Sequence, residues 1–277
     1  MSAAVVRLDA VEAAIVRSGE LKPPLGPVGY LVAQAVVTGC LAYRRTRVLD
    51  GLDLSLDAGV HGLLGPNGAG KTSLVRVLST VLTPGAGTVR LLGRDVSDRH
   101  GRTEVRRRLG YLPQQLGYFP GFTVREFVEY MAWLKEVPAA RVPAAVDDAL
   151  ERVDLAGRGS SRMRTLSGGM LRRAGIAQAI VNSPKLLLLD EPTAGLDPEQ
   201  RVGFRALLRE LGTNATVVVS THLVEDVASA CTGVVLLDSG QVRWTGTADE
   251  LAAAGAGGVG DTASERGYLA LLRGARA

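Results

Sequence analysis

Hydrophobic and polar positions repeat with two different periods along this chain. Leu52, Leu54 and Leu56 alternate with polar residues, which predicts a strand with one wet face. Short, mostly apolar runs typical of buried strands occur at 60–64, 186–189 and 216–220. Apolar residues at helical spacing follow them, at 73–78, 123–136, 143–153, 168–181 and 198–211. Alternating strands and helices predict an α/β fold with a mostly parallel sheet that binds ligands at the carboxyl ends of its strands.

Caps and turns sharpen these boundaries. Thr123 and Glu126 have the spacing of a capping box, and Ser167 can cap the helix that follows it. Asp197 followed by proline predicts another helix start. Residues 234–238 and 241–245 flank a Ser-Gly pair and predict a hairpin.

The two ends of the chain have weaker patterns. Residues 1–34 are interpreted as an N-terminal extension, in which Ala4, Leu8, Val11 and Ile15 form one helical stripe. An amphipathic helix, a frayed tail and residues upstream of the real start all remain open. Residues 23–43 lack charge, but their prolines and glycines favour a loop followed by a strand at 35–41 over a membrane span. Residues 247–277 are predicted to form a short tail, with a Gly/Ala-rich link at 252–260 before a helix near 268–272.

Composition excludes several classes of protein. With 277 residues, 46% of them hydrophobic, the chain is long and apolar enough for a sizeable core. A net charge of +4 does not favour nucleic acid as a partner, and the arginine runs at 106–108 and 172–173 are typical of solvated faces. Two distant cysteines, Cys40 and Cys231, indicate a reduced, cytosolic protein. Mixed charges in the first twenty residues do not resemble a secretory signal.

A glycine-rich loop follows the apolar run at 60–64 and fits G-x-x-x-x-G-K-[ST], the pattern of a phosphate-binding loop. The loop consists of Gly65, Pro66, Asn67, Gly68, Ala69, Gly70, Lys71 and Thr72, and Ser73 begins the predicted helix. Backbone N–H groups of such a loop point at the anion, and the helix dipole adds positive potential. Lys71 can reach the β- and γ-phosphates, and Thr72 offers a hydroxyl to Mg²⁺.

Two carboxylates follow the run of four leucines at 186–189. Asp190, at the tip of a buried strand beside a phosphate loop, is placed to hold Mg²⁺. Glu191 can then polarise the attacking water as a general base.

A second glycine motif precedes these carboxylates. Ser167, Gly168 and Gly169 would leave backbone N–H groups exposed at the start of a helix, which is a second anion site. By itself such a motif is usually a loop, and its place shortly before Asp190 is what gives it weight.

The order of these motifs resembles the nucleotide-binding subunits of ABC transporters, from about residue 36 to 250. The residues that carry the resemblance are the loop at 65–72, Gln114, residues 166–169, residues 186–191, residues 195–197 and His222. It implies a P-loop NTPase core (35–246) with a mostly parallel sheet, an antiparallel β subdomain and an inserted α-helical subdomain at about 115–172. The cofactors implied are ATP and Mg²⁺.

The resemblance also implies roles for single residues. Gln114 would touch the metal and the attacking water, and His222 would hydrogen-bond the γ-phosphate. Tyr43 stands where the family stacks an aromatic ring on adenine, and the less favoured alternative is an ordinary turn tyrosine.

In the family, two subunits close head to tail over shared ATP. Ser167, Gly168 and Gly169 would then contact the γ-phosphate held by the opposite subunit, and Asp197 would cross the interface between the two. The partner is either a second copy or a different cassette.

Aromatic side chains gather after Gln114, at Tyr118, Phe119, Phe122, Tyr130 and Trp133 among others. Ordinary core packing accounts for part of the group. In the family this region receives a helix of the membrane permease, so we expect Phe119 and Phe122 to line that groove.

The resemblance implies an ATP-hydrolysing subunit on the cytoplasmic face of the membrane, held there by a separate permease. The residues of the two glycine motifs, at 63–72 and 166–173, most resemble those of exporters of drugs, antibiotics and other hydrophobic compounds. Another cargo (lipid, polysaccharide, haem or ion), a soluble ABC ATPase and a non-catalytic nucleotide-binding module are the alternatives. The stretch after Gln114 is too short for the long coiled coil of DNA-repair members, and there is one cassette where translation factors have two. Lys71, Glu191 and His222 are all present, which disfavours a non-catalytic module.

Overall fold

The computed structural model describes residues 4–15, 42–256 and 258–274, and describes side chains from residue 48 onward. The strand expected at 35–41 and Cys40 therefore lie outside the described residues. Among the described residues, no helix has the length and apolar character needed to cross a bilayer.

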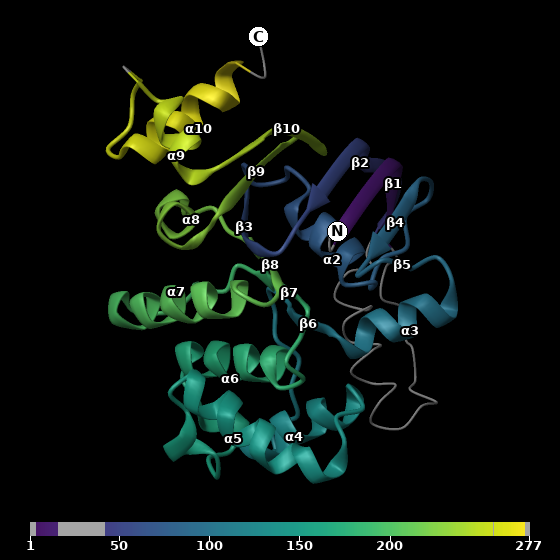
Figure 1. Cartoon of the computed structure of the whole chain (residues 1–277), viewed down its shortest axis with the longest axis vertical. Helices are drawn as coiled ribbons and strands as arrows, with labels where there is room; N and C mark the ends of the chain where they lie inside the picture. Colours follow the sequence, from purple (N-terminus) through teal and green to yellow (C-terminus); the bar gives the residue numbers. More distant parts are fainter. Residues whose placement is uncertain (1–3, 16–41, 257, 275–277) are drawn as a thin grey trace.

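A six-stranded sheet runs through the centre of the molecule in the order β10-β9-β3-β8-β7-β6 (Figure 1). Its strands are β3 (Gly59–Leu64), β6 (Leu109–Leu112), β7 (Leu186–Asp190), β8 (Thr216–Ser220), β9 (Gly233–Asp238) and β10 (Gln241–Gly246). Every neighbouring pair is parallel except β9 and β10, which form the expected hairpin. The predicted mostly parallel α/β sheet is confirmed.

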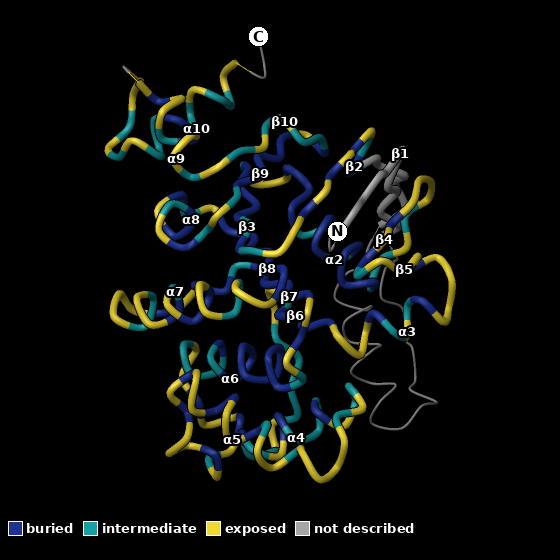
Figure 2. Tube along the Cα trace, in the orientation of Figure 1, coloured by how far each residue is buried: buried dark blue, intermediate teal, exposed yellow. Residues whose placement is uncertain are grey.

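Both faces of this sheet are covered, which explains its uniformly apolar strands. Leu187 and Leu189 of β7 belong to a core shared with the helices after β6. Leu186 and Leu188 point the other way, into a core shared with α2 (Lys71–Leu78) and the small sheet. All four leucines are fully buried, as Figure 2 shows for the centre of the molecule.

The small sheet is antiparallel and has the order β2-β1-β4-β5. It contains β1 (Ala4–Ile15), β2 (Ala42–Leu56), β4 (Thr88–Leu91) and β5 (Arg94–Asp95). The helix considered for the N-terminal extension is wrong, because Ala4–Ile15 is a strand paired with both β2 and β4. These residues belong to the antiparallel sheet and are not an addition to it.

Helices gather below the central sheet in Figure 1. They are α4 (Val124–Leu134), α5 (Val142–Arg152) and α6 (Gly168–Ile180), with short 3-10 turns at Ala139–Arg141, Ala156–Arg158 and Met163–Thr165. Thr123 and Glu126 form the expected capping box, and Ser167 caps α6. Phe127 is the largest of the fully buried side chains and belongs to the core on this side of the sheet.

The remaining helices are α3 (Arg99–Arg107), α7 (Pro198–Gly212), α8 (Val224–Ala230), α9 (Ala248–Ala253) and α10 (Ala263–Gly274). The hydrophobic pattern did not predict α3, α8 or α9. The last helix is longer than expected, and α9 ends inside the stretch interpreted as a link. Leu251 of α9 packs with α8, β9 and α10 in a separate small core.

Candidate functional site

The glycine-rich loop at 65–70 connects β3 to α2 and curls back over the start of that helix. Gly65 and Gly70 have φ angles of 157° and 103°. A Cβ at Gly65 would lie 2.1 Å from the backbone oxygen of Leu237, and one at Gly70 would lie 2.7 Å from Leu49. Both positions favour glycine: a side chain at Gly65 would collide with the backbone of β9, and one at Gly70 would have to adopt a strained positive φ.

Lys71 begins α2 and its side chain lies over the loop. Its Nζ donates to the carbonyl oxygens of Gly65 (2.6 Å) and Pro66 (3.0 Å). Burial lowers the pKa of Lys71, and the negative charges of Glu191 and Asp190 oppose this shift. The loop therefore presents a cation whose position is held by the loop's own backbone.

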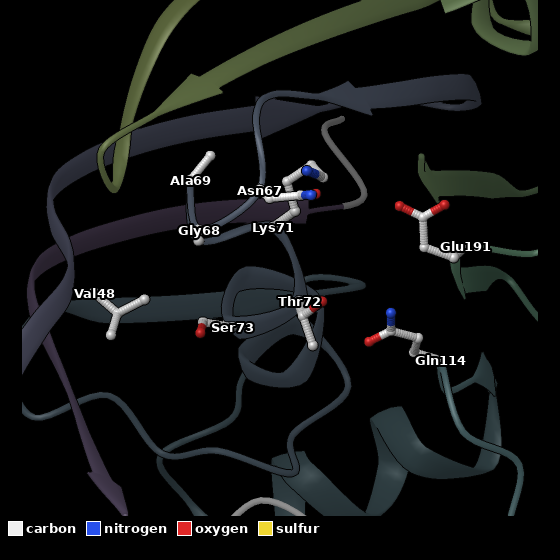
Figure 3. A pocket seen from close by; sticks show the side chains of 10 residues that line it. Val48, Asn67, Gly68, Ala69, Lys71, Thr72, Ser73, Gln114 and Glu191 are labelled. Carbon is white, nitrogen blue, oxygen red and sulfur yellow. The ribbon is translucent and has the colours of Figure 1, made fainter. Parts of the chain in front are cut away.

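A pocket of about 280 Å³ opens beside this loop. Figure 3 shows Gln114 and Glu191 across from Lys71 and Thr72. The residues that line the pocket are Val48, Asn67, Gly68, Ala69, Gly70, Lys71, Thr72, Ser73, Gln114 and Glu191. The sequence-predicted loop, Gln114 and Glu191 thus meet in one site, although they are far apart in the chain.

Asp190 ends β7 and is fully buried. Its Oδ1 accepts a hydrogen bond from the Thr72 hydroxyl at 3.4 Å, while its Oδ2 has no hydrogen-bond partner among the described residues. Burial raises the pKa of Asp190, and the nearby hydroxyls of Ser220 and Thr72 oppose this shift. A buried carboxylate oxygen without a partner, next to a hydroxyl, is a donor set that suits a hard divalent cation such as Mg²⁺.

Glu191 follows directly and turns out of the strand with a φ of 51°. Its backbone N–H donates to the Ser220 carbonyl (2.8 Å), and its Oε2 lies 3.0 Å from Nδ1 of His222. The strained backbone aims the carboxylate into the pocket, and His222 holds it there from the end of the neighbouring strand. The structure brings two of the three predicted catalytic side chains, Glu191 and His222, into direct contact.

The second glycine motif lies elsewhere. Ser167 accepts a hydrogen bond from the Met170 N–H (3.3 Å), and Asp197 accepts one from the Gln200 N–H (2.8 Å), so both act as helix caps. A Cβ at Gly169 would lie 3.0 Å from the carbonyl oxygen of Gly195, so the two segments pack together. Among the described residues, neither Ser167, Gly168 and Gly169 nor Asp197 lines the pocket beside Lys71.

Two site positions were missed from the sequence, and one expected position is not described. Val48 lines the pocket, but as one apolar residue of a strand it carries no distinguishing signal. Arg172, expected on a solvated face, is only 7% exposed and contacts the segments that carry Gln114 and Glu191. The signal that was available is the stretch 174–180 that follows the two arginines, in which every residue except Gln178 is apolar or glycine. Tyr43 lies in β2, and its side chain is outside the described residues.

The site combines a parallel sheet, a glycine loop with Lys71 at the start of a helix, and two carboxylates at the end of β7. This combination defines a nucleotide-binding ATPase of the phosphate-loop class. The comparisons with known proteins agree. Residues 49–194 match the family described as ABC transporter. The chain belongs to this family, as an ATP-binding ATPase subunit.

Three relatives illustrate the similarity. The daunorubicin resistance ATP-binding protein DrrA3 of Streptomyces coeruleorubidus is 43% identical over 76% of this chain and 67% of its own length. DrrA, the daunorubicin/doxorubicin resistance ATP-binding protein of Streptomyces peucetius, is 40% identical over 76% and 63% of the two lengths. A Nod factor export ATP-binding protein I of Cupriavidus metallidurans is 37% identical over 74% and 67%. The chain thus spans about two thirds of the length of these relatives.

Solved structures show the same fold. The structure of an ATP-binding subunit of an ABC transporter superposes with a TM-score of 0.73 at 26% identity, covering 83% of this chain and 95% of that one. A dimeric bacterial ABC transporter cassette gives a TM-score of 0.72 over 88% and 98% of the two chains. At 21% identity this second likeness shows the fold alone.

Proposed function

We propose that this chain hydrolyses ATP to drive an exporter of drug-like, antibiotic or other hydrophobic compounds through a separate permease. The observation that carries the catalytic part is the contact of Glu191 with His222 across the pocket from Lys71 and Thr72. Export is supported by the relatives, which are drug resistance and Nod factor export ATP-binding proteins. The subunit then lies on the cytoplasmic face of the membrane, held there by the permease.

Each group of residues at the pocket has its own role in the hydrolysis of ATP. Lys71 and the loop N–H groups bind the β- and γ-phosphates of ATP. Thr72, Asp190 and Gln114 would hold Mg²⁺, which neutralises charge that develops on the phosphates. Glu191 accepts a proton from the attacking water at its free carboxylate oxygen.

His222 keeps Glu191 aimed by contacting its other oxygen, Oε2, and presents its second ring nitrogen to the γ-phosphate. A substitution of His222 would therefore change both the orientation of the base and the number of donors at the phosphate. Tyr43 is proposed to stack on adenine.

The second glycine motif supports a head-to-tail dimer. Ser167 and Gly169 stand at the N-terminus of α6, a favourable place for an anion, yet they lie outside the pocket of their own chain. We propose that they and Asp197 complete the ATP site of a second cassette, while the partner's motif completes this one. ATP then holds the two subunits together, and hydrolysis separates them.

The test is Glu191→Gln, which keeps the shape of the side chain but removes the base. We expect ATP hydrolysis to fall by about 10²–10⁴-fold and the variant to accumulate as an ATP-bound dimer on size-exclusion chromatography. Glu151→Gln, an exposed position on α5, is the matched control and should hydrolyse at the wild-type rate. Wild-type turnover by Glu191→Gln would show that Glu191 is not the base. A dimer formed by this chain alone would show that it pairs with a second copy.

The aromatic group after Gln114 supports the proposed contact with the permease. Phe119 and Phe122 lie 4.9 Å apart, and each is 5.9 Å from the ring of Tyr130. Tyr130 stacks on Trp133, whose side chain is 62% exposed. Together these four residues form an aromatic cluster at the outer side of α4, of the kind that anchors protein contacts.

Replacing both Phe119 and Phe122 with alanine should release the subunit from its permease and leave its basal hydrolysis within about two-fold of wild type, because neither ring lines the pocket. Co-purification from membranes and ATPase activity of the free subunit measure the two effects. Val259→Ser, a change at another exposed apolar side chain, is the control. Unchanged assembly of the double variant would move the permease contact away from this cluster.

A further inference from the structure

Arg172 is a buried cation whose guanidinium joins two parts of the site. It lies on the second turn of α6 and is 7% exposed. Its Nη1 donates to the carbonyl oxygens of Pro113 (2.9 Å) and Gln114 (3.0 Å). Nη2 donates to the carbonyls of Asp190 and Glu191, and Nε to that of Pro192 (3.3 Å).

These five carbonyls belong to two segments that leave the sheet side by side. Gln114 follows β6 and Glu191 follows β7, which are neighbouring parallel strands with Leu112 opposite Leu189. Beyond that pair the two chains are no longer connected by ladder hydrogen bonds, because the strands end. The guanidinium takes the place of the ladder at the point where both chains enter the pocket.

The chemistry of this contact requires arginine. A planar guanidinium offers five N–H donors in a fixed arrangement, whereas an ammonium offers three donors around one point. Burial lowers the pKa of Arg172, and the charges of Asp190 and Glu191 oppose this shift. Removing the guanidinium from water therefore costs folding free energy, which the bonds to backbone oxygens offset only in part. Such a cost is consistent with a position that is used to orient its neighbours.

The rest of α6 is anchored, which makes Arg172 a firm support. Gln178 of the same helix donates to the Tyr111 carbonyl of β6 at 2.8 Å. A Cβ at Gly110 would lie 2.0 Å from the carbonyl oxygen of Ala179, so strand and helix touch through their backbones. The guanidinium is therefore fixed relative to β6 before it reaches the loops.

We propose that Arg172 is a positioning residue that sets the distance between Gln114 and Glu191 and so passes any shift of the segment after β6 to the catalytic base. This inference rests on the roles proposed above for Gln114 and Glu191. Arg172 contacts none of the residues 65–72 that bind the phosphates. Its loss should therefore lower kcat and leave ATP affinity nearly unchanged.

The variants are Arg172→Lys, which keeps the charge, and Arg172→Gln, which removes it. We expect kcat to fall about 10–100-fold for Arg172→Gln, the range seen when groups that orient a reacting ligand are removed, with a smaller loss for Arg172→Lys. The Kd of a fluorescent ATP analogue should stay within about two-fold of wild type, because the contacts that bind ATP before the reaction do not involve Arg172. Arg173→Gln is the matched control, since Arg173 points away and binds Asp154 and the carbonyl of Val153.

A double variant separates positioning from a general loss of structure. If Arg172 acts through Gln114, then Arg172→Lys combined with Gln114→Ala should lose less kcat than the product of the two single losses. Losses that multiply, or wild-type kcat in a folded Arg172→Lys, overturn the proposal. A Kd that weakens in parallel with kcat also overturns it. Should Arg172→Gln fail to fold by circular dichroism, Arg172→Lys decides the question alone.

Glu191→Gln is measured alongside to keep the two ideas apart. Wild-type hydrolysis by Glu191→Gln would refute the proposed base and with it the route from Arg172 to that base. An inactive Glu191→Gln together with a fully active Arg172→Lys would refute only the positioning role.

Discussion

The helices that follow Asp197 and His222 are joined by a nearly buried ion pair, which provides a quantitative test of how this half of the site is held. Oδ1 of Asp226 on α8 accepts from Nη2 (2.8 Å) and Nε (3.1 Å) of Arg205 on α7. The Asp226 side chain is 7% exposed and that of Arg205 is 25% exposed. The other carboxylate oxygen, Oδ2, has no partner among the described residues.

Arg205→Met removes the cation and keeps most of the apolar stem. It leaves the Asp226 carboxylate buried without a partner, a change that typically costs 3–5 kcal/mol. Because the Arg205 side chain is a quarter exposed, water can partly replace it, and we expect a loss of about 3 kcal/mol. Asp226→Leu should cost about 1–2 kcal/mol, since the freed guanidinium can turn towards solvent.

The double variant Arg205→Met/Asp226→Leu should lie within about 1 kcal/mol of wild type, because the Coulomb attraction and the cost of desolvation largely cancel. Urea unfolding followed by circular dichroism measures all four proteins. With a slope of about 3 kcal/mol per molar urea, the Arg205→Met midpoint should fall by about 1 M.

The control for this cycle is Arg209→Met, which removes hydrogen bonds from the same helix to the Ser229 carbonyl but no ion pair. It should cost about 1 kcal/mol or less. If the losses of the two single variants simply add in the double variant, the pair has no coupling energy and the reasoning is refuted.

Two further predictions concern stability. Burial lowers the pKa of Lys135 to about 8, from 10.5 in the unfolded chain, while its Nζ donates to the carbonyls of Arg106 and Leu109. The unfolded state therefore binds more protons than the folded state between about pH 8 and 10.5, so the free energy of unfolding should rise with pH in this window. Measured by urea unfolding, the rise relative to Lys135→Met should reach up to about 3 kcal/mol. A difference that stays flat with pH would contradict the lowered pKa. Gly110→Ala should cost at least about 2 kcal/mol in the same assay, because its Cβ would meet a backbone oxygen at 2.0 Å. In the control Gly157→Ala, the new Cβ has no neighbour within 4 Å, and the free energy of unfolding should stay within about 0.5 kcal/mol of wild type. Equal losses at Gly110 and Gly157 would count against the contact between β6 and α6.

The sequence by itself determined the features that are local. The phosphate-binding loop needs glycines, Lys71 and Thr72 at fixed spacings, because the chemistry happens within a few consecutive residues. Helix caps such as Thr123 are likewise set by hydrogen bonds over one turn. The buried strand that ends in Asp190 was evident because both faces of a parallel strand must be apolar.

Only the tertiary structure decided features that depend on residues far apart in the chain. Ala4–Ile15 has an apolar stripe that suits a helix, yet it forms β1 because its hydrogen-bonding partners are β2 and β4. Pairing of strands is a property of neighbours that no short window contains. The same reason applies to Arg172, whose charge predicts solvent but whose five carbonyl partners come from two strand ends. Its burial, and with it the connection between Gln114 and Glu191, follows from how α6 packs on the sheet.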